Sequence, residues 1–214
     1  MTFSLIGHVG AVVREVANGR RDGKATRIVM ATRTYDTDPD DLWDALTNAE
    51  RIPRWFLPVS GELRLGGRYQ FEGNAGGQVT ACDPPERLSV TWEFGGQVSW
   101  VTVTLAAQGD GQTVLRLEHE AIPDGEFWPT YGPGAVGVGW DLAMMGLAFH
   151  LAGGEKPPQE AFLAWNASDD AKALMRTCSQ AWAEADIAGG EEPGQARTAA
   201  GRTAAFYTGE GAPA

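Results

Sequence analysis

One histidine stands where it could take part in chemistry. Leu115, Leu117 and His119 alternate with Arg116 and Glu118, a pattern typical of a strand with one buried face. His119 is therefore expected to point inward, where a neutral imidazole can donate a hydrogen bond to a ligand or accept one from it. A hydrogen-bonded histidine of the core fits the same pattern and is the favoured interpretation.

Asp141 is the second candidate, because it lies in a long apolar stretch. It could be a general base whose pKa is raised by burial. We favour a structural role, in which Asp141 pairs with an arginine or faces the C-terminal segment. Ser60, Ser89 and Ser99 show no convincing relation to a histidine, and the chain has no Gly-x-Ser-x-Gly turn, so no nucleophile is predicted.

The other histidines, His8 and His150, complete no metal-binding spacing with His119. We therefore predict neither a metal nor a cofactor. His150 is expected to pack or cap near the end of a helix.

Aromatic side chains give the strongest indication of binding. Tyrosine and tryptophan bring a polar tip to an apolar wall, which suits a pocket for a small molecule, although a filled core uses the same residues. With His119 as the polar anchor, the predicted lining is Trp55, Phe56, Tyr69, Phe71, Trp92, Trp128, Tyr131, Trp140 and Met144.

The element that would hold these residues is an apolar helix from Pro133 to Gly153. Its bulky residues form one stripe and its small residues another, so other structure must enclose it. The small stripe either lets a neighbour approach closely or leaves a void. A membrane span is the alternative, since the length approaches the roughly 20 residues required. Asp141 would cost about 2.5–3.5 kcal/mol there, so we predict a buried helix.

The segments before this helix indicate an antiparallel sheet. Residues 6–35 read as a hairpin whose strands are Val9 to Val16 and Lys24 to Tyr35. Asp38 and Pro39 predict the start of a helix. Residues 51–58 form a broken aromatic connector, and from residue 61 the period becomes alternating, which predicts a meander with one exposed face. Between residues 98 and 105 both faces are partly apolar, and residues 122–132 read as a loop.

The C-terminal segment has a different composition, rich in alanine. Ser168 can cap one helix, and another is expected from Pro193 to about Tyr207. We expect a domain over residues 1–154 and a helical extension over residues 155–214. The extension could close the pocket, pack on the open side of the sheet or form a homodimer interface.

Composition limits the partners. The net charge of −11 disfavours nucleic acid and anionic membranes, which need a basic surface. Cys82 and Cys178 fit no redox or metal spacing, and the start lacks a basic segment followed by an apolar core. A cytoplasmic protein without a signal peptide is expected.

Short blocks between residues 25 and 152 stand in a set order: Arg33 to Asp36, Pro39 to Thr47, Arg54 to Phe56, Gly66 to Tyr69, Pro84 to Leu88, Thr91 to Glu93 and Leu115 to His119. In this order they resemble the blocks of bacterial SRPBCC proteins of the START-like superfamily. The most similar branch is the C-terminal domain of the activator of heat-shock-protein-90 ATPase. The resemblance implies an α+β helix-grip fold, in which a curved antiparallel sheet wraps a long C-terminal helix.

Three functions are compatible with that resemblance. The first, which we favour, is binding of a hydrophobic or aromatic small molecule between the sheet and the long helix. The second is an enzyme of the polyketide cyclase or aromatase kind, in which His119 moves protons with help from Tyr69 or Tyr131. The third is a co-chaperone-like interaction module. Fold does not decide among them.

Overall fold

The computed structural model describes residues 9–210, so His8 lies outside the described residues. In chain order the elements are β1 (Val13–Arg21), β2 (Lys24–Tyr35), α2 (Pro39–Thr47), the 3-10 turn η1 (Ile52–Arg54), β3 (Val59–Gly61), β4 (Arg68–Phe71), β5 (Gly76–Asp83), β6 (Arg87–Phe94), β7 (Gln97–Gln108), β8 (Gln112–Ala121), α3 (Phe127–Tyr131), α4 (Gly134–Leu151), α5 (Gln159–Asn166), α6 (Asp169–Ala188) and α7 (Pro193–Thr208).

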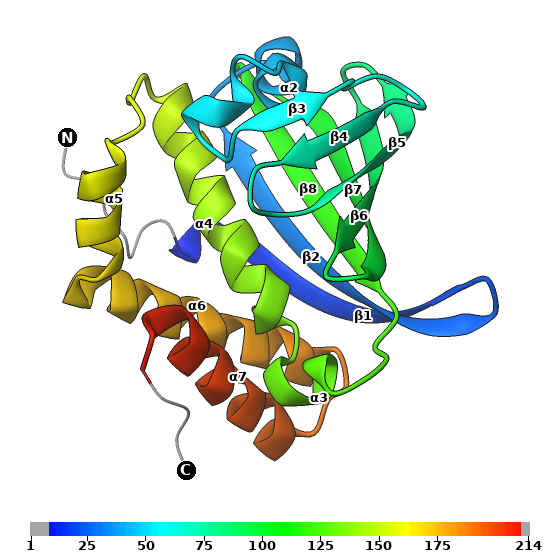
Figure 1. Cartoon of the computed structure of the whole chain (residues 1–214), viewed down its shortest axis with the longest axis vertical. Helices are drawn as coiled ribbons and strands as arrows, with labels where there is room; N and C mark the ends of the chain where they lie inside the picture. Colours follow the sequence, from blue (N-terminus) through cyan, green and yellow to red (C-terminus); the bar gives the residue numbers. More distant parts are fainter. Residues whose placement is uncertain (1–8, 211–214) are drawn as a thin grey trace. The chain divides into compact units, whose positions relative to one another are not determined.

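The strands form an eight-stranded sheet in the order β1-β2-β8-β7-β6-β5-β4-β3 (Figure 1). With the long helix α4, it confirms the predicted α+β helix-grip fold. The described chain divides into two compact units. Unit 1 comprises the residues up to Ala31, Ile122–Leu142 and the residues from Pro157 onward; unit 2 comprises Thr32–Ala121 and Ala143–Lys156.

Unit 2 contains the meander, and its register separates the two faces of the sheet. Val101 lies opposite Val90 on one side and His119 on the other, so these three side chains share a face. Val101 and Leu105 are buried. The alternation that the sequence left open between residues 98 and 105 is thereby resolved, with the odd-numbered residues on the face of His119.

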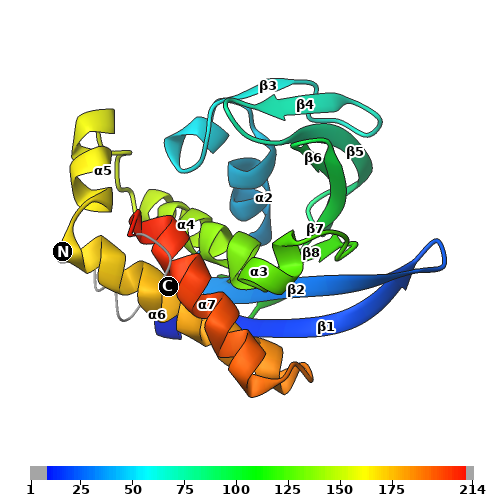
Figure 2. The same cartoon turned by 60° about the horizontal axis from the view of Figure 1, so that its bottom comes forward.

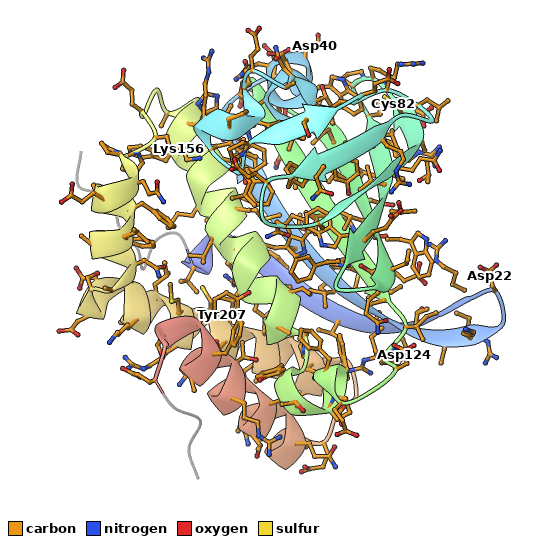
Figure 3. All side chains as sticks on the ribbon, in the orientation of Figure 1. Asp22, Asp40, Cys82, Asp124, Lys156 and Tyr207 are labelled. Carbon is orange, nitrogen blue, oxygen red and sulfur yellow. The ribbon has the colours of Figure 1, made fainter. Side chains whose placement is uncertain are left out.

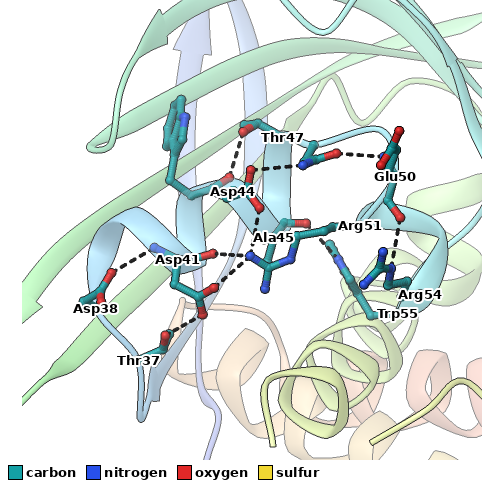
Figure 4. A network of polar contacts seen from close by, with 12 residues as sticks. Thr37, Asp38, Asp41, Asp44, Ala45, Thr47, Glu50, Arg51, Arg54 and Trp55 are labelled. Atoms are coloured by element: carbon teal, nitrogen blue, oxygen red, sulfur yellow. Dashed lines mark hydrogen bonds and ion pairs between the residues drawn. The ribbon is translucent and has the colours of Figure 1, made fainter. Parts of the chain in front are cut away.

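Helix α2 begins as its sequence predicts. The Asp38 side chain accepts a hydrogen bond from the Asp41 backbone N–H at 2.9 Å, and Pro39 is the first helical residue. The connector after α2 is irregular, with one 3-10 turn, as expected. Figure 4 shows how Arg51 ties it to the helix, with the guanidinium 2.8 Å from the carboxylate of Asp41 and 2.9 Å from that of Asp44.

Unit 1 contains the antiparallel pair α6 and α7, which lie side by side in Figures 1 and 2. The Ser168 side chain accepts a hydrogen bond from the backbone N–H of Ala171, and α7 starts at Pro193, as predicted. Two expectations were wrong. Strand β1 begins at Val13 rather than Val9 and continues to Arg21, so the turn falls at Asp22 (Figure 3). The expected loop over residues 122–132 contains α3.

The glycines in the first half of α4 are docking positions for the C-terminal helices. A Cβ placed on Gly137 would lie 2.3 Å from the Trp182 ring, and one on Gly134 would lie 3.1 Å from the Thr203 side chain. The Tyr207 hydroxyl donates a hydrogen bond to the Ala135 carbonyl at 2.9 Å. The predicted small stripe comprises Ala135, Gly139, Ala143 and Gly146, and a Cβ on Gly139 would lie 3.2 Å from the Tyr207 hydroxyl. At these positions the stripe admits neighbours at close range, the first of the two predicted possibilities.

Helix α4 is long and apolar enough to cross a membrane by length and composition, a test that the core helix of a soluble protein also passes. Its middle carries Asp141, which is 1% exposed and paired with Arg14. This burial against the C-terminal helices matches the predicted core helix and gives no indication of a membrane span.

Candidate functional site

A row of aromatic rings runs through unit 2 from the connector to the sheet. Ring centroids are separated by 5.5 Å between Trp55 and Phe56, 5.0 Å between Phe56 and Phe71, and 5.7 Å between Phe71 and Trp92. The row ends at His119, whose ring lies 6.1 Å from that of Trp92. These predicted site residues, far apart in sequence, are therefore brought together.

Polar contacts fix the orientation of this row. The Trp55 indole donates a hydrogen bond to the Ala45 carbonyl at 2.9 Å (Figure 4). Tyr69, whose ring contacts Phe71 at 5.3 Å, donates its hydroxyl proton to the Thr91 carbonyl at 2.7 Å. At the end of the α4 segment Lys156 (Figure 3) donates to the carbonyl of Phe56 at 2.6 Å. The connector is thus anchored by α2 and by Lys156, and Tyr69 is fixed on the sheet.

The row is not packed like an ordinary core. Trp55, Phe56, Phe71 and Trp92 are only partly buried, although large aromatic residues bury the most apolar area when enclosed. His119, in contrast, is 4% exposed. The row therefore keeps part of its apolar surface exposed beside a buried polar group.

His119 is held by a serine. Its Nε2 lies 2.8 Å from the Ser99 hydroxyl. Burial lowers the pKa of His119 from 6.5 to about 4, so the ring is neutral near pH 7. The expectation that Ser99 has no relation to a histidine was wrong. Ser99 pairs with Trp92 across the strands, and it lies two residues before Val101, which pairs with His119. Strand pairing of this kind cannot be read from a single sequence.

Met144 belongs to the same unit as the row. Its side chain is 3% exposed, and its carbonyl accepts a hydrogen bond from the buried Tyr35 hydroxyl at 3.2 Å. Two residues later on α4, a Cβ on Gly146 would lie 2.5 Å from the Trp55 carbonyl. The second half of α4 is therefore packed on the connector that carries the first ring of the row.

The remaining predicted lining residues lie in unit 1. Trp128 and Tyr131 are on α3 and Trp140 is in the first half of α4. The Arg27 guanidinium stands 5.0 Å from the centre of the Trp128 ring, and the Tyr131 ring contacts Phe206 at 5.9 Å. Their place in a ligand site stays a prediction.

Asp141 has a structural environment. Arg14 donates to its carboxylate from Nε at 3.1 Å and from a terminal nitrogen at 2.9 Å, and the Trp182 indole donates at 2.9 Å. Burial raises the pKa of Asp141, an effect opposed by Arg14 and by hydrogen bonds from Trp182 and Cys178. The predicted arginine partner is confirmed.

Two other features were considered as sites. His150 lies near the end of α4, and its Nε2 is buried without a hydrogen-bond partner among the described residues; burial lowers its pKa, helped by Arg51 and Arg54. Within residues 9–210, no group of three His, Cys, Asp or Glu side chains is arranged to hold a metal ion.

An open groove of about 810 Å³ lies between α6 and α7 in unit 1. It is lined by alanines such as Ala200 and Ala204, and by charged residues that already pair with each other, as Arg176 does with Glu210 at 2.5 Å. We favour the aromatic row as the candidate site, because it combines accessible rings with a buried polar group.

The comparison with known families agrees with this fold. Residues 36–152 match the family described as "Activator of Hsp90 ATPase homolog 1-like protein". The chain belongs to this family. The resemblance drawn from the sequence blocks is thereby confirmed. The family match includes the whole aromatic row, and it ends before α5.

Solved structures of similar proteins match more of the chain than the family model does. The solution structure of CalU16 from Micromonospora echinospora is 30% identical, with a TM-score of 0.70 over 84% of this chain and 97% of that chain. Its crystal structure is 28% identical, with a TM-score of 0.65 over 82% and 98%. MLL2253 from Mesorhizobium loti is 28% identical, with a TM-score of 0.52 over 59% and 97%. A search of curated proteins finds no match.

Proposed function

We propose that this family member binds a hydrophobic or aromatic small molecule against the aromatic row of unit 2. The observation that carries the proposal is the contiguous set Trp55, Phe56, Phe71 and Trp92, whose rings contact one another while remaining partly accessible. A flat aromatic ligand can stack on such faces. His119 supplies the polar contact at the end of the row.

Binding is favoured over the cyclase or aromatase alternative by the state of His119. An efficient general base has a pKa near the working pH, whereas burial lowers the pKa of His119 to about 4. A ring with so low a pKa accepts a hydrogen bond at neutral pH but is a weak proton acceptor. The co-chaperone alternative depends on an exposed surface that binds another protein. The contacts of the aromatic row neither favour nor disfavour it.

Tryptophan fluorescence and thermal melting during titration with neutral aromatic compounds would test the proposal. A ligand that binds only the native state quenches the signal saturably and raises the melting temperature. We expect Trp92→Leu to weaken binding by up to about tenfold, since it removes a stacking contact of roughly 0.5–1.5 kcal/mol.

The matched control is Trp100→Leu. Trp100 follows Ser99 on β7, so it points to the opposite face of the sheet from Trp92. This variant should bind as the wild type does. Equal loss in both variants, or no saturable binding of any compound in the wild type, would contradict the proposal.

A further inference from the structure

The ammonium group of Lys156 (Figure 3) is bound to the backbone of the connector, residues 51–58, which carries the first two rings of the aromatic row. Its Nζ donates hydrogen bonds to the carbonyl of Pro53 at 2.9 Å and to that of Phe56 at 2.6 Å. Hydrogen bonds from a charged donor are shorter and stronger than those between neutral groups. One side chain therefore joins two separate points of the connector.

The end of α4 turns the chain sharply just before Lys156. The backbone N–H of Gly154 donates to the carbonyl of Phe149 at 2.9 Å. That of Gly153 donates to the carbonyl of His150, also at 2.9 Å. With Gly153 at a φ of 79°, these two bonds form a Schellman motif, which closes the helix. Because Lys156 comes directly after this closed turn, its backbone is held close to the end of α4.

Lys156 also determines how the backbone of Phe56 is held. The N–H groups of Trp55 and Phe56 both donate to the carbonyl of Ile52, at 3.2 and 2.9 Å. Lysine side chains can bond the last carbonyls of a helical turn, as Lys156 does at Pro53 in the 3-10 turn η1. Phe56 is thereby held at its N–H by the turn and at its carbonyl by the ammonium group.

Phe56 is the residue through which the connector joins the part of the row that lies on the sheet. Its ring lies 5.5 Å from that of Trp55 in the connector and 5.0 Å from that of Phe71 on β4. The ring planes of Phe56 and Phe71 meet at 86°. Edge-to-face contacts depend on the direction of both rings, so a shift of the Phe56 backbone would interrupt the row at this point.

We propose that Lys156 is a positioning residue for the aromatic row: its ammonium group holds the connector so that the Phe56 ring stays against Phe71 and a ligand meets a continuous aromatic surface. The effect on a ligand rests on the proposed function, because it concerns binding to the same row. The hold on the connector does not depend on it.

The hold on the connector is measured without any ligand, by amide hydrogen exchange followed by NMR in the wild type, Lys156→Met and Lys156→Arg. Methionine keeps an unbranched apolar chain but has no proton to donate. The Phe56 amide should exchange about three- to tenfold faster in Lys156→Met, as expected for the loss of one hydrogen bond. Lys156→Arg restores a charged donor and should exchange nearly as the wild type does.

The Leu105 amide, which donates to the Glu86 carbonyl at 2.8 Å, is the internal control for this experiment. It lies in the meander, away from the connector in sequence, and its exchange should not change in any variant. Unchanged exchange at Phe56 in Lys156→Met, or an equal rise at Leu105, would overturn the proposed hold.

The effect on binding is measured by calorimetric titration with 2-naphthol, a neutral aromatic probe of two rings. Lys156→Met should weaken binding by about three- to tenfold, and Lys156→Arg should recover most of the affinity. Lys172→Met is the matched control, since Lys172 pairs with Glu210 at 3.5 Å in unit 1. It removes the same charge and should bind as the wild type does.

A double-mutant cycle separates positioning from a general loss of stability. If Lys156 acts through Phe56, Lys156→Met should cost no further affinity in a Phe56→Leu background and should keep its full effect in a Trp92→Leu background. Equal losses in both backgrounds, or no loss in the single variant, would overturn the effect on binding. If the wild type does not bind 2-naphthol, the proposed function fails for this ligand class and the effect on binding fails with it, while hydrogen exchange still decides the hold on the connector.

Discussion

The two units each bury a titratable side chain, and they surround it in different ways. In unit 1, Asp141 receives hydrogen bonds from Arg14 and Trp182, so strand β1 and helices α4 and α6 meet at one carboxylate. In unit 2, His119 is fixed through Ser99 at the end of a row of partly accessible rings. One buried group is paired with a charge, and the other adjoins rings that are only partly buried.

This difference indicates that the two buried groups have different roles, one in stability and the other in binding. A buried charge with several partners stabilises its surroundings only while every partner is present. A neutral imidazole needs far less compensation, so it can stand beside a surface that changes when a ligand arrives. Changes at Asp141 should therefore act on stability, and changes along the aromatic row should act on binding.

The largest effect is expected at Asp141. Asp141→Ala leaves the Arg14 guanidinium without its carboxylate, while the Arg14 side chain is 6% exposed. Such a change costs about 3–5 kcal/mol in the free energy of unfolding. Urea denaturation followed by circular dichroism measures it.

The control removes both ends of the pair. Arg14→Met combined with Asp141→Ala should recover much of the loss, because no charge is then buried alone. A loss below about 1 kcal/mol in Asp141→Ala would show that the carboxylate is not the point at which these elements are joined.

A smaller effect is expected from the titration of His119. Burial lowers its pKa from 6.5 to about 4 in the folded state. Above pH 6.5 both the folded and the unfolded chain are neutral at this ring. Between pH 6.5 and 4 the unfolded chain takes up a proton that the folded chain excludes, so stability falls as the pH falls.

The wild type should therefore lose about 2 kcal/mol more than His119→Gln between pH 7 and 5. Urea denaturation at these two pH values gives the difference directly. Parallel losses in both proteins would mean that the imidazole is solvated in the folded state, and the comparison with Asp141 would lose its basis.

Local signals in the sequence predicted the elements well. Asp38, Ser168 and Pro193 mark helix starts that the structure reproduces, because a cap depends on neighbours within one turn. Errors occurred where tertiary contacts decide, as at the beginning of β1. Phe71, Trp92 and His119 were predicted to face inward, since alternation alone separates the faces of a strand. Trp55 and Phe56 lie in the irregular connector, where no such pattern applies.

Partners distant in sequence could not be predicted. Asp141 was expected to meet an arginine, but Arg14 lies 127 positions away and only the folded chain identifies it. Ser99 was dismissed because the pairing of β7 with β8, which brings it to His119, depends on strand register. A single sequence contains the residue types of these contacts but not their geometry.

The smallest predicted effect concerns the glycines of the helices in unit 1. Gly137→Ala would place a methyl group 2.3 Å from the ring of Trp182, which is fully buried and cannot move aside. Overpacking costs about 1–3 kcal/mol and alanine regains about 1 kcal/mol of helix propensity. A net loss of about 1 kcal/mol in the free energy of unfolding is expected, measured by thermal or urea unfolding.

Gly201→Ala in α7 is the control. A Cβ there meets nothing within 4 Å, so this change should stabilise the protein by about 0.5–1 kcal/mol. If both changes stabilise, Trp182 does not require the glycine, and close packing of α6 on α4 does not explain the small residues of the long helix.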